Sequence, residues 1–335
     1  MTEHSKIPLP SETDGLPDGS LFERASGVFG LDPFRSAPVP GVLADAPAKR
    51  TRAVQPPPKA VAVPAEPVAV PQQSVADHQA PHRAKVNDPP AVRFGAVRHP
   101  IDRERLRERG LIVPEAGATE LLEEFRIIKR QVLAAAQAAG DAAARRVLIC
   151  SPLPGDGKTF CATNLAIAMA GERDGEVLLV DADFAKPSIL STLGLPKGPG
   201  LMDALADDSA NVEEFVMATD IPGLFVLPAG TQTTADSEHL ASARTAEVLD
   251  RLTRGAPTRM VVFDSPPALA ASPAADLARH VGQALLVARA DRTGRTAIED
   301  SIRLLSACPD IKLLLNATHF SPSGRRFGTY YGYEG

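Results

Sequence analysis

The feature that most constrains this chain is a glycine-rich loop set between an apolar strand and an apolar helix. Residues 146–164 read RVLICSPLPGDGKTFCATN, in which the run up to Cys150 predicts a buried strand and the run from Phe160 to Ala170 predicts a helix. Glycines let backbone N–H groups curl around phosphate oxygens, and a helix N-terminus adds partial positive charge. The pattern predicts a phosphate-binding P-loop, although a strand-to-helix turn without a nucleotide has the same local pattern.

Residues within this loop match the roles that a bound nucleotide requires. Lys158 would reach the β- and γ-phosphates, and the Thr159 hydroxyl would bind Mg²⁺. The usual pattern has a glycine five positions before Gly157, where this chain has Pro152. We predict that ATP with Mg²⁺ binds along the following residues: Pro154, Gly155, Asp156, Gly157, Lys158, Thr159 and Phe160.

Two later apolar runs end in carboxylates. One ends in Asp181 and Asp183, and the other ends in Asp264. In a doubly wound parallel sheet, ligands lie at the carboxyl ends of the strands, so all three acids would face the bound phosphates. Mg²⁺ prefers oxygen ligands, and we predict Thr159, Asp183 and Asp264 as its site. Each acid by itself could equally cap a strand end or a solvated turn.

From residue 146 onward, predicted strands and helices alternate, which favours a parallel sheet with helices on both faces. The predicted strands are 146–150, 177–181, 224–228, 260–264, 284–288 and 311–316. The predicted helices are 159–171, 201–206, 212–219, 236–254, 273–280 and 294–307. The predicted fold class is α/β: a P-loop NTPase with a mostly parallel, doubly wound sheet.

Composition divides the chain and excludes some functions. Proline, alanine and valine alternate between Gln55 and Gln73, and such a segment buries too little surface to fold. The expected domains are a disordered segment (1–97), a helical lead-in (98–117), the P-loop domain (118–318) and a flexible tail (319–335). A net charge of −5 indicates no nucleic-acid partner, and no apolar run reaches the ~20 residues of a membrane span.

Two features lie outside the predicted nucleotide site. The chain has three tyrosines, Tyr330, Tyr331 and Tyr333, and all of them lie in the tail, outside the predicted core. Tyrosine usually packs in cores and interfaces, so this clustering is unusual. A tail strand that packs on a partner through these aromatic rings would also explain it. The helix predicted at 118–139 has an apolar face, and its other face carries three charges, Glu123, Arg126 and Lys129. Those charges could simply form a solvated face with i,i+3 pairs.

Taken together, these motifs resemble the bacterial tyrosine autokinases of polysaccharide-export systems, from about residue 98 to the C-terminus. Residues 154–159 are similar to their Walker A loop, 180–187 to their Walker A′ motif, and 263–267 to their Walker B motif. Glu123, Arg126 and Lys129 resemble the helix through which such kinases form rings, although Lys replaces the final Arg. Ala185 stands where Walker A′ commonly has Arg. The subgroup linked to exosortase exopolysaccharide loci is the most similar.

The resemblance implies a catalytic set of Lys158, Asp181 and Asp183, in which Asp181 accepts the proton of the incoming tyrosine. It implies autophosphorylation of the tail tyrosines within a homo-oligomer. It also implies a separate membrane-embedded chain-length regulator as activator, a tyrosine phosphatase, and a cytoplasmic location peripheral to the inner membrane. Two alternatives remain: a ParA- or MinD-type positioning ATPase, whose signature lysine is replaced here by Leu153, and a nucleotide-binding scaffold without turnover.

Overall fold

The structure, a computed structural model, describes residues 91–173 and 175–318. Residues 1–90 of the segment expected to be disordered, and the tail with Tyr330, Tyr331 and Tyr333, lie outside the described residues. The strands are β1 (Arg98–His99), β2 (Arg146–Cys150), β3 (Glu176–Asp181), β4 (Met217–Thr219), β5 (Leu224–Leu227), β6 (Arg259–Asp264), β7 (Gln283–Arg289) and β8 (Ile311–Asn316).

Helices alternate with these strands along the described part of the chain. The α-helices are α2 (Arg103–Glu108), α3 (Glu120–Ala139), α4 (Lys158–Ala170), α5 (Ile189–Leu193), α6 (Leu201–Ala206), α7 (Asp236–Ala241), α8 (Ala243–Thr253), α9 (Pro273–Leu277) and α10 (Arg295–Leu304). Two short 3₁₀ helices are η2 (Ala143–Arg145) and η3 (Val212–Phe215).

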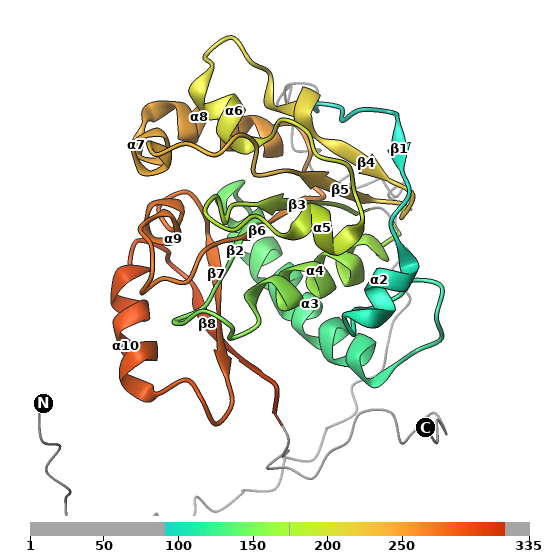
Figure 1. The fold of residues 1–335 in the computed structure, drawn as a ribbon, viewed down its shortest axis with the longest axis vertical. Helices are drawn as coiled ribbons and strands as arrows, with labels where there is room; N and C mark the ends of the chain where they lie inside the picture. The colour runs from blue at the N-terminus through green and yellow to red at the C-terminus, as the bar shows by residue number, and fades with distance from the viewer. Residues whose placement is uncertain (1–90, 174, 319–335) are drawn as a thin grey trace, which may run out of the picture. The chain divides into compact units, whose positions relative to one another are not determined.

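All eight strands form one sheet in the order β1-β4-β5-β3-β6-β2-β7-β8 within the described residues (Figure 1). Neighbouring strands are parallel except β4 and β5, which are antiparallel. From β2 the chain winds to β3 and β5 on one side, then returns through β6 to β7 and β8. Such a reversal leaves a crevice at the carboxyl ends of the central strands. The prediction of a mostly parallel, doubly wound sheet is confirmed.

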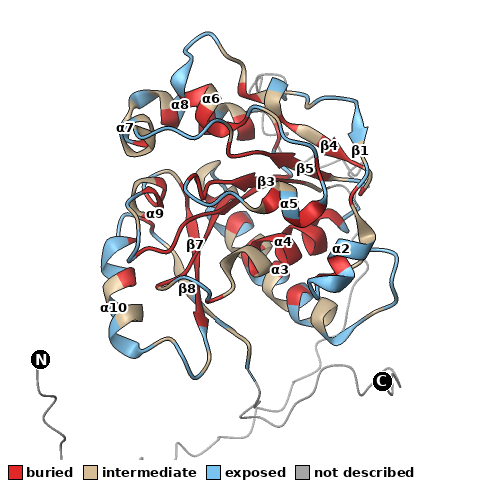
Figure 2. Ribbon diagram, in the orientation of Figure 1, coloured by how far each residue is buried: buried red, intermediate tan, exposed pale blue. Residues whose placement is uncertain are grey.

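The two faces of the sheet pack against separate apolar cores, because successive strand residues point to opposite faces. In β2, Val147 and Ile149 face one core, while Leu148 and Cys150 face the other. Helices α2, α3, α4 and α5 cover the first face, and α6, α8 and α9 cover the second. Helix α4 is buried along most of its length (Figure 2), which explains why its sequence is apolar on every side.

The predicted strands match β2, β3, β5, β6, β7 and β8 to within one residue at each end. The helix predicted at 212–219 is wrong in its second half, because Met217–Thr219 forms β4 and pairs with β5. The helix predicted at 236–254 breaks at Ser242, whose backbone is extended. Its hydroxyl donates to the carbonyl of His239, as Ser side chains do where they end helices.

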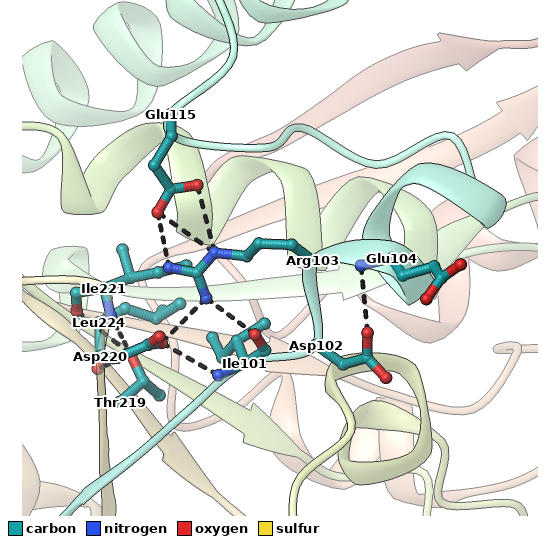
Figure 3. A network of polar contacts seen from close by, with 9 residues as sticks. All are labelled: Ile101, Asp102, Arg103, Glu104, Glu115, Thr219, Asp220, Ile221 and Leu224. Carbon is teal, nitrogen blue, oxygen red and sulfur yellow. Dashed lines mark hydrogen bonds and ion pairs between the residues drawn. The ribbon is translucent and has the colours of Figure 1, made fainter.

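The lead-in to the P-loop domain is fastened to the sheet by a polar network around Arg103 (Figure 3). The Arg103 guanidinium contacts the Glu115 carboxylate at 2.6 Å and the Asp220 carboxylate at 3.0 Å. It also donates to the carbonyl of Ile101 at 2.9 Å. The Ile101 N–H donates in turn to Asp220. The network therefore joins the start of α2 to the segment that links β4 and β5.

Residues before the lead-in also contact the sheet. The Phe94 ring lies edge-on to Phe225 of β5, with centroids 5.0 Å apart, and the Arg259 guanidinium lies 4.0 Å from the Phe94 centroid. Arg259 also donates to the carbonyl of Val92 at 2.8 Å. Val92 and Phe94 lie within the segment 1–97, which composition predicts to be disordered. Their contacts with Arg259 and Phe225 correct that prediction at these residues.

Candidate active site

The P-loop connects β2 to α4, and its shape depends on glycine at position 157. Gly157 has a φ of +101°, in the left-handed region that L-residues rarely adopt. A Cβ built there would lie 1.9 Å from Nδ2 of Asn316, which ends β8. The Asn316 amide donates to the carbonyl of Asp156 at 2.9 Å, so backbone and side chain meet too closely for any other residue.

The Asp156 side chain turns into the loop and shapes it. Its Oδ2 accepts from the Leu153 N–H at 3.0 Å, and its Oδ1 accepts from the Thr293 hydroxyl at 3.0 Å. Asp156 is fully buried. Asp156 was predicted to bind the nucleotide; its side chain is committed to these internal bonds, which leaves its backbone N–H as the group that could face a phosphate.

Phe160, another predicted nucleotide contact, likewise sends its side chain elsewhere. Its ring packs edge-on against Phe125 of α3, with centroids 6.3 Å apart. Phe160 is partly buried and packs against the apolar core on the α3 and α4 side of the sheet. Any contact of Phe160 with a nucleotide would therefore use its backbone N–H at the start of α4.

The predicted lysine, threonine and carboxylates meet at the carboxyl ends of β3 and β6. Lys158 Nζ lies 3.0 Å from Asp183 Oδ2. The Thr159 hydroxyl donates to Asp264 Oδ2 at 2.7 Å. The three strands that end here, β2, β6 and β3, are neighbours in the sheet. The structure thus brings these predicted residues together, while their roles remain proposals.

Burial gives the carboxylates at this site unusual acid–base properties. Burial raises the pKa of Asp264 to about 7, against the opposing effects of Lys158 and the Thr159 hydroxyl. Burial also raises the pKa of Asp181 to about 6, although three backbone N–H groups oppose the rise. Those groups belong to Ile189 at 2.9 Å, Ser188 at 2.8 Å and Asp183 at 3.3 Å. Asp181 therefore also caps the start of α5.

The donor set fits a hard cation such as Mg²⁺. Asp264 Oδ1 is buried and has no hydrogen-bond partner in the described part of the chain, which is costly unless another ligand satisfies it. The Thr159 hydroxyl and the Asp183 carboxylate supply further oxygen atoms beside it, the ligand type that Mg²⁺ prefers. In residues 91–318, apart from residue 174, no cluster of three or more His, Cys, Asp or Glu side chains could hold a metal unaided.

A cavity of about 480 Å³ opens beside Asp181. The turn after Asp183, including Pro187, forms one side of it, and the loop after β5, including Gln232, forms the other. Leu190 and Pro228 contribute apolar surface, and Lys197 contributes a positive charge. The cavity thus offers space for an apolar ring next to a buried carboxylate.

Several residues that shape the P-loop were not predicted. Arg289 and Arg292 donate to the carbonyls of Gly155 and Pro154, each at 3.4 Å, and Thr293 and Asn316 bond to Asp156. All four lie at or just after the carboxyl ends of β7 and β8. The carboxyl ends of parallel strands lie at the same edge of the sheet. The predicted ends of β7 and β8 could therefore have identified these residues as neighbours of the P-loop.

The helix predicted to form an oligomer interface is α3, and its three charged residues do not share one environment. Glu123 and Arg126 form an exposed intrachain ion pair. Lys129 is buried, and its ammonium contacts Glu172 at 2.5 Å. The expectation that Lys129 lies on the interaction face with the other two is therefore corrected: Lys129 ties α3 to the end of α4.

The fold and the loop together define a P-loop nucleotide-binding protein. No family model matches the chain. YwqD of Bacillus subtilis, a tyrosine-protein kinase, is 30% identical over 215 residues, which span 64% of this chain and 86% of that protein. The chain belongs to the family of bacterial tyrosine-protein kinases.

A second relative and a solved structure extend this comparison. EpsB of Ralstonia nicotianae, named as a candidate tyrosine-protein kinase, is 34% identical over 63% of this chain but only 29% of its own length. The chain therefore spans about a third of the length of the first relatives that it matches. The kinase domain of the Escherichia coli tyrosine kinase ETK has the same fold, with a TM-score of 0.53 and 23% identity over 67% of this chain and 96% of that domain.

Proposed function

We propose that the chain is an ATP-dependent protein-tyrosine autokinase that phosphorylates Tyr330, Tyr331 and Tyr333. The observation that carries this proposal is the meeting of two contacts, Lys158 with Asp183 and Thr159 with Asp264, beside a glycine-shaped P-loop. Both contacts lie at the sheet edge where doubly wound folds bind ligands. Membership of the tyrosine-protein kinase family supports the choice of phosphoryl transfer over other uses of ATP.

Phosphoryl transfer depends mainly on positioning and on charge stabilisation, and this chain supplies groups for both. Backbone N–H groups from Gly155 to Phe160 would hold the phosphates, and Lys158 would neutralise charge that develops on the transferred group. Thr159, Asp183 and Asp264 would hold Mg²⁺, which when bound offsets the negative charge of the phosphates.

The acceptor hydroxyl would approach from the cavity beside Asp181. A phenol has a pKa near 10, so a base of pKa about 6 needs to remove its proton only as transfer proceeds. The apolar walls at Pro187 and Leu190 suit the face of a tyrosine ring. We assign the acceptor ring to this cavity and the proton-accepting role to Asp181.

Transfer between subunits follows from the length of the tail and from the proposed oligomer. From Thr318 to Tyr330–Tyr333 is 12 to 15 residues, which extend to roughly 40–50 Å. Subunits that associate through the exposed pair Glu123 and Arg126 would present each tail to a neighbouring site at high effective concentration. Lys129 is left out of this interface because it is buried.

The cellular setting is proposed from the family resemblance. Phosphorylation of the tail would regulate exopolysaccharide polymerisation and export, with a membrane-embedded regulator as activator and a phosphatase as antagonist. The kinase would then act at the cytoplasmic face of the inner membrane through that regulator. In the structure, none of the helices in residues 91–318, setting aside residue 174, is long and apolar enough to cross a membrane.

A mixing experiment tests the proposed reaction and its direction together. A Lys158→Met chain with an intact tail is incubated with an active chain whose three tail tyrosines are Phe. Phosphate on the Lys158→Met chain supports transfer between subunits. Its absence, with wild-type self-labelling at a rate independent of concentration, would mean that each tail serves its own site.

A further inference from the structure

A glutamine outside the P-loop joins the loop after β5 to the turn that carries Asp183. The Gln232 side-chain amide donates from Nε2 to the carbonyl of Phe184 at 3.2 Å and to that of Ala185 at 3.3 Å. Both carbonyls belong to residues 183–187, which we call the Asp183 turn. Gln232 thus contacts the turn through its side chain and lines the same cavity as Asp181.

The inner side of the Asp183 turn sets the direction of the Asp183 carboxylate. The Lys186 N–H donates to Asp183 Oδ1 at 3.2 Å and to the Asp183 carbonyl at 3.1 Å. The other carboxylate oxygen, Oδ2, lies 3.0 Å from the ammonium of Lys158. A shift of the turn would therefore rotate the carboxylate that faces Lys158.

The segment before Gln232 is hydrogen-bonded to the start of α6. The first N–H groups of a helix lack partners inside the helix, and here those of Leu201 and Met202 donate to the carbonyls of Pro228 and Ala229, at 2.8 and 2.9 Å. Gly200 permits this approach, because a Cβ there would lie 2.0 Å from the Pro228 carbonyl oxygen.

A carboxylate completes this support. Asp203 Oδ2 accepts from the N–H of Gly200 at 2.7 Å and from the N–H of Thr231 at 3.1 Å. Thr231 is the residue immediately before Gln232, so the amide that reaches the Asp183 turn extends from a backbone fixed on α6. The run LPAG at 227–230, which the nucleotide contacts do not require, thereby gains a role as a support for Gln232.

We propose that Gln232 is a positioning residue that holds the Asp183 turn, and so keeps Asp183 directed at Lys158 and the metal site. Gln232 acts through Asp183 and does not touch the reacting groups. Its effect on phosphoryl transfer rests on the proposed kinase function, whereas its effect on the turn and on the binding of ATP with Mg²⁺ does not.

Two substitutions separate the hydrogen bonds from the rest of the side chain. Gln232→Ala removes both bonds, and Gln232→Glu keeps the shape but turns an acceptor toward two carbonyls. Each should weaken ATP binding in Mg²⁺ about tenfold and raise the Mg²⁺ concentration for half-maximal binding, while the melting temperature stays near that of the wild type. Gln137→Ala and Gln137→Glu, at an exposed glutamine of α3, are matched controls that should change neither quantity.

Hydrogen exchange and a double-mutant cycle decide whether the effect passes through Asp183. Without nucleotide, Gln232→Ala should speed amide exchange within residues 184–189 and leave α4 unchanged. In an Asp183→Asn background, Gln232→Ala should cause little further loss of ATP affinity, because coupled residues are not additive. Wild-type affinity and exchange in Gln232→Ala, or a full tenfold loss in both backgrounds, would overturn the proposal. Absence of tyrosine phosphorylation in the wild type would instead refute the kinase function alone.

Discussion

The Arg103 network and the P-loop end of the sheet both place charged groups together, yet they treat those groups differently. The Arg103 guanidinium pairs with the carboxylates of Glu115 and Asp220. Its hydrogen bonds with Glu115 hold the pKa of that carboxyl below its usual range. At the P-loop end, Asp264 is fully buried, one of its oxygens has no partner among the described residues, and burial raises its pKa to about 7.

The Arg103 network therefore stabilises the fold, whereas the buried carboxylates at the P-loop end are suited to binding a ligand. A charge that is paired and partly hydrated stabilises the chain modestly. A buried carboxylate with an orphaned oxygen costs stability, and such groups persist at sites where a ligand satisfies them. Substitutions in the Arg103 network should therefore mainly change stability, and substitutions at the P-loop end should mainly change binding and activity.

The largest effect is expected at Lys158. Lys158→Met should lower tyrosine phosphorylation by at least about a thousandfold, because the reaction loses a positioned charge on the transferred group. The melting temperature should change little, since the ammonium of Lys158 forms one ion pair in the described structure, with Asp183. Phosphate transfer assays and a melting curve on the same preparation check both parts. A large drop in melting temperature would mean that Lys158 stabilises the fold, which would contradict a role confined to binding and transfer.

Truncation of the residues before α2 should instead lower the stability of the chain. A chain that begins at Ala91 should match the full chain in melting temperature and ATP affinity. A chain that begins at Ile101 lacks β1 and the Phe94 contacts, and should lose about 2–4 kcal/mol of unfolding free energy. Denaturant unfolding of both chains measures the difference. Equal stability of the two would show that residues 91–100 carry no part of the fold.

Asp264→Asn should make the nucleotide-free chain more stable and impair its binding. Removing the buried charge relieves a desolvation cost of about 1–2 kcal/mol, which raises the melting temperature by several degrees. The same change removes a proposed metal ligand, so ATP affinity should no longer respond to Mg²⁺. Melting curves without nucleotide, with the wild type alongside, provide the check. A lower melting temperature would indicate that the carboxylate is needed structurally.

Arg103→Met should have the smallest effect and a purely structural one. The ion pairs of Arg103 are partly exposed, so their loss should cost about 1 kcal/mol, or about 2–4 °C in melting temperature. ATP affinity should be unchanged, because the network lies at the lead-in rather than at the P-loop. A titration of ATP with the variant tests this, and a tenfold weaker affinity would break the separation between the two regions.

The P-loop, the strands that precede Asp183 and Asp264, and the mostly parallel sheet could be predicted from the sequence, because each depends on a local pattern or on where a strand ends. It missed β4, since a three-residue strand is decided by its pairing with β5 and not by its own sequence. It also placed Lys129 on an exposed face, because three-residue spacing cannot tell a solvated charge from one paired with Glu172.

The contacts that reach the P-loop from a distance were also beyond the sequence. Asn316 lies 160 residues from Asp156 along the chain, and only the register of β8 brings its amide to the loop. The Gln232 bonds to the Asp183 turn depend in the same way on how the β5 loop rests on α6. The residue types at Asn316 and Gln232 indicate no contact with the P-loop or the Asp183 turn until the fold brings these segments together.

In the proposed reaction, the P-loop and its carboxylates promote transfer of phosphate from ATP to the tail tyrosines. The most direct measurement is phosphosite mass spectrometry of the full chain and of its Lys158→Met variant, each purified from cells of the organism that makes it, so that any activating partner is present. If the proposed reaction occurs, we expect phosphate on Tyr330, Tyr331 or Tyr333 in the wild type and none in the variant. Equal phosphate on both chains, or none on either, would contradict it.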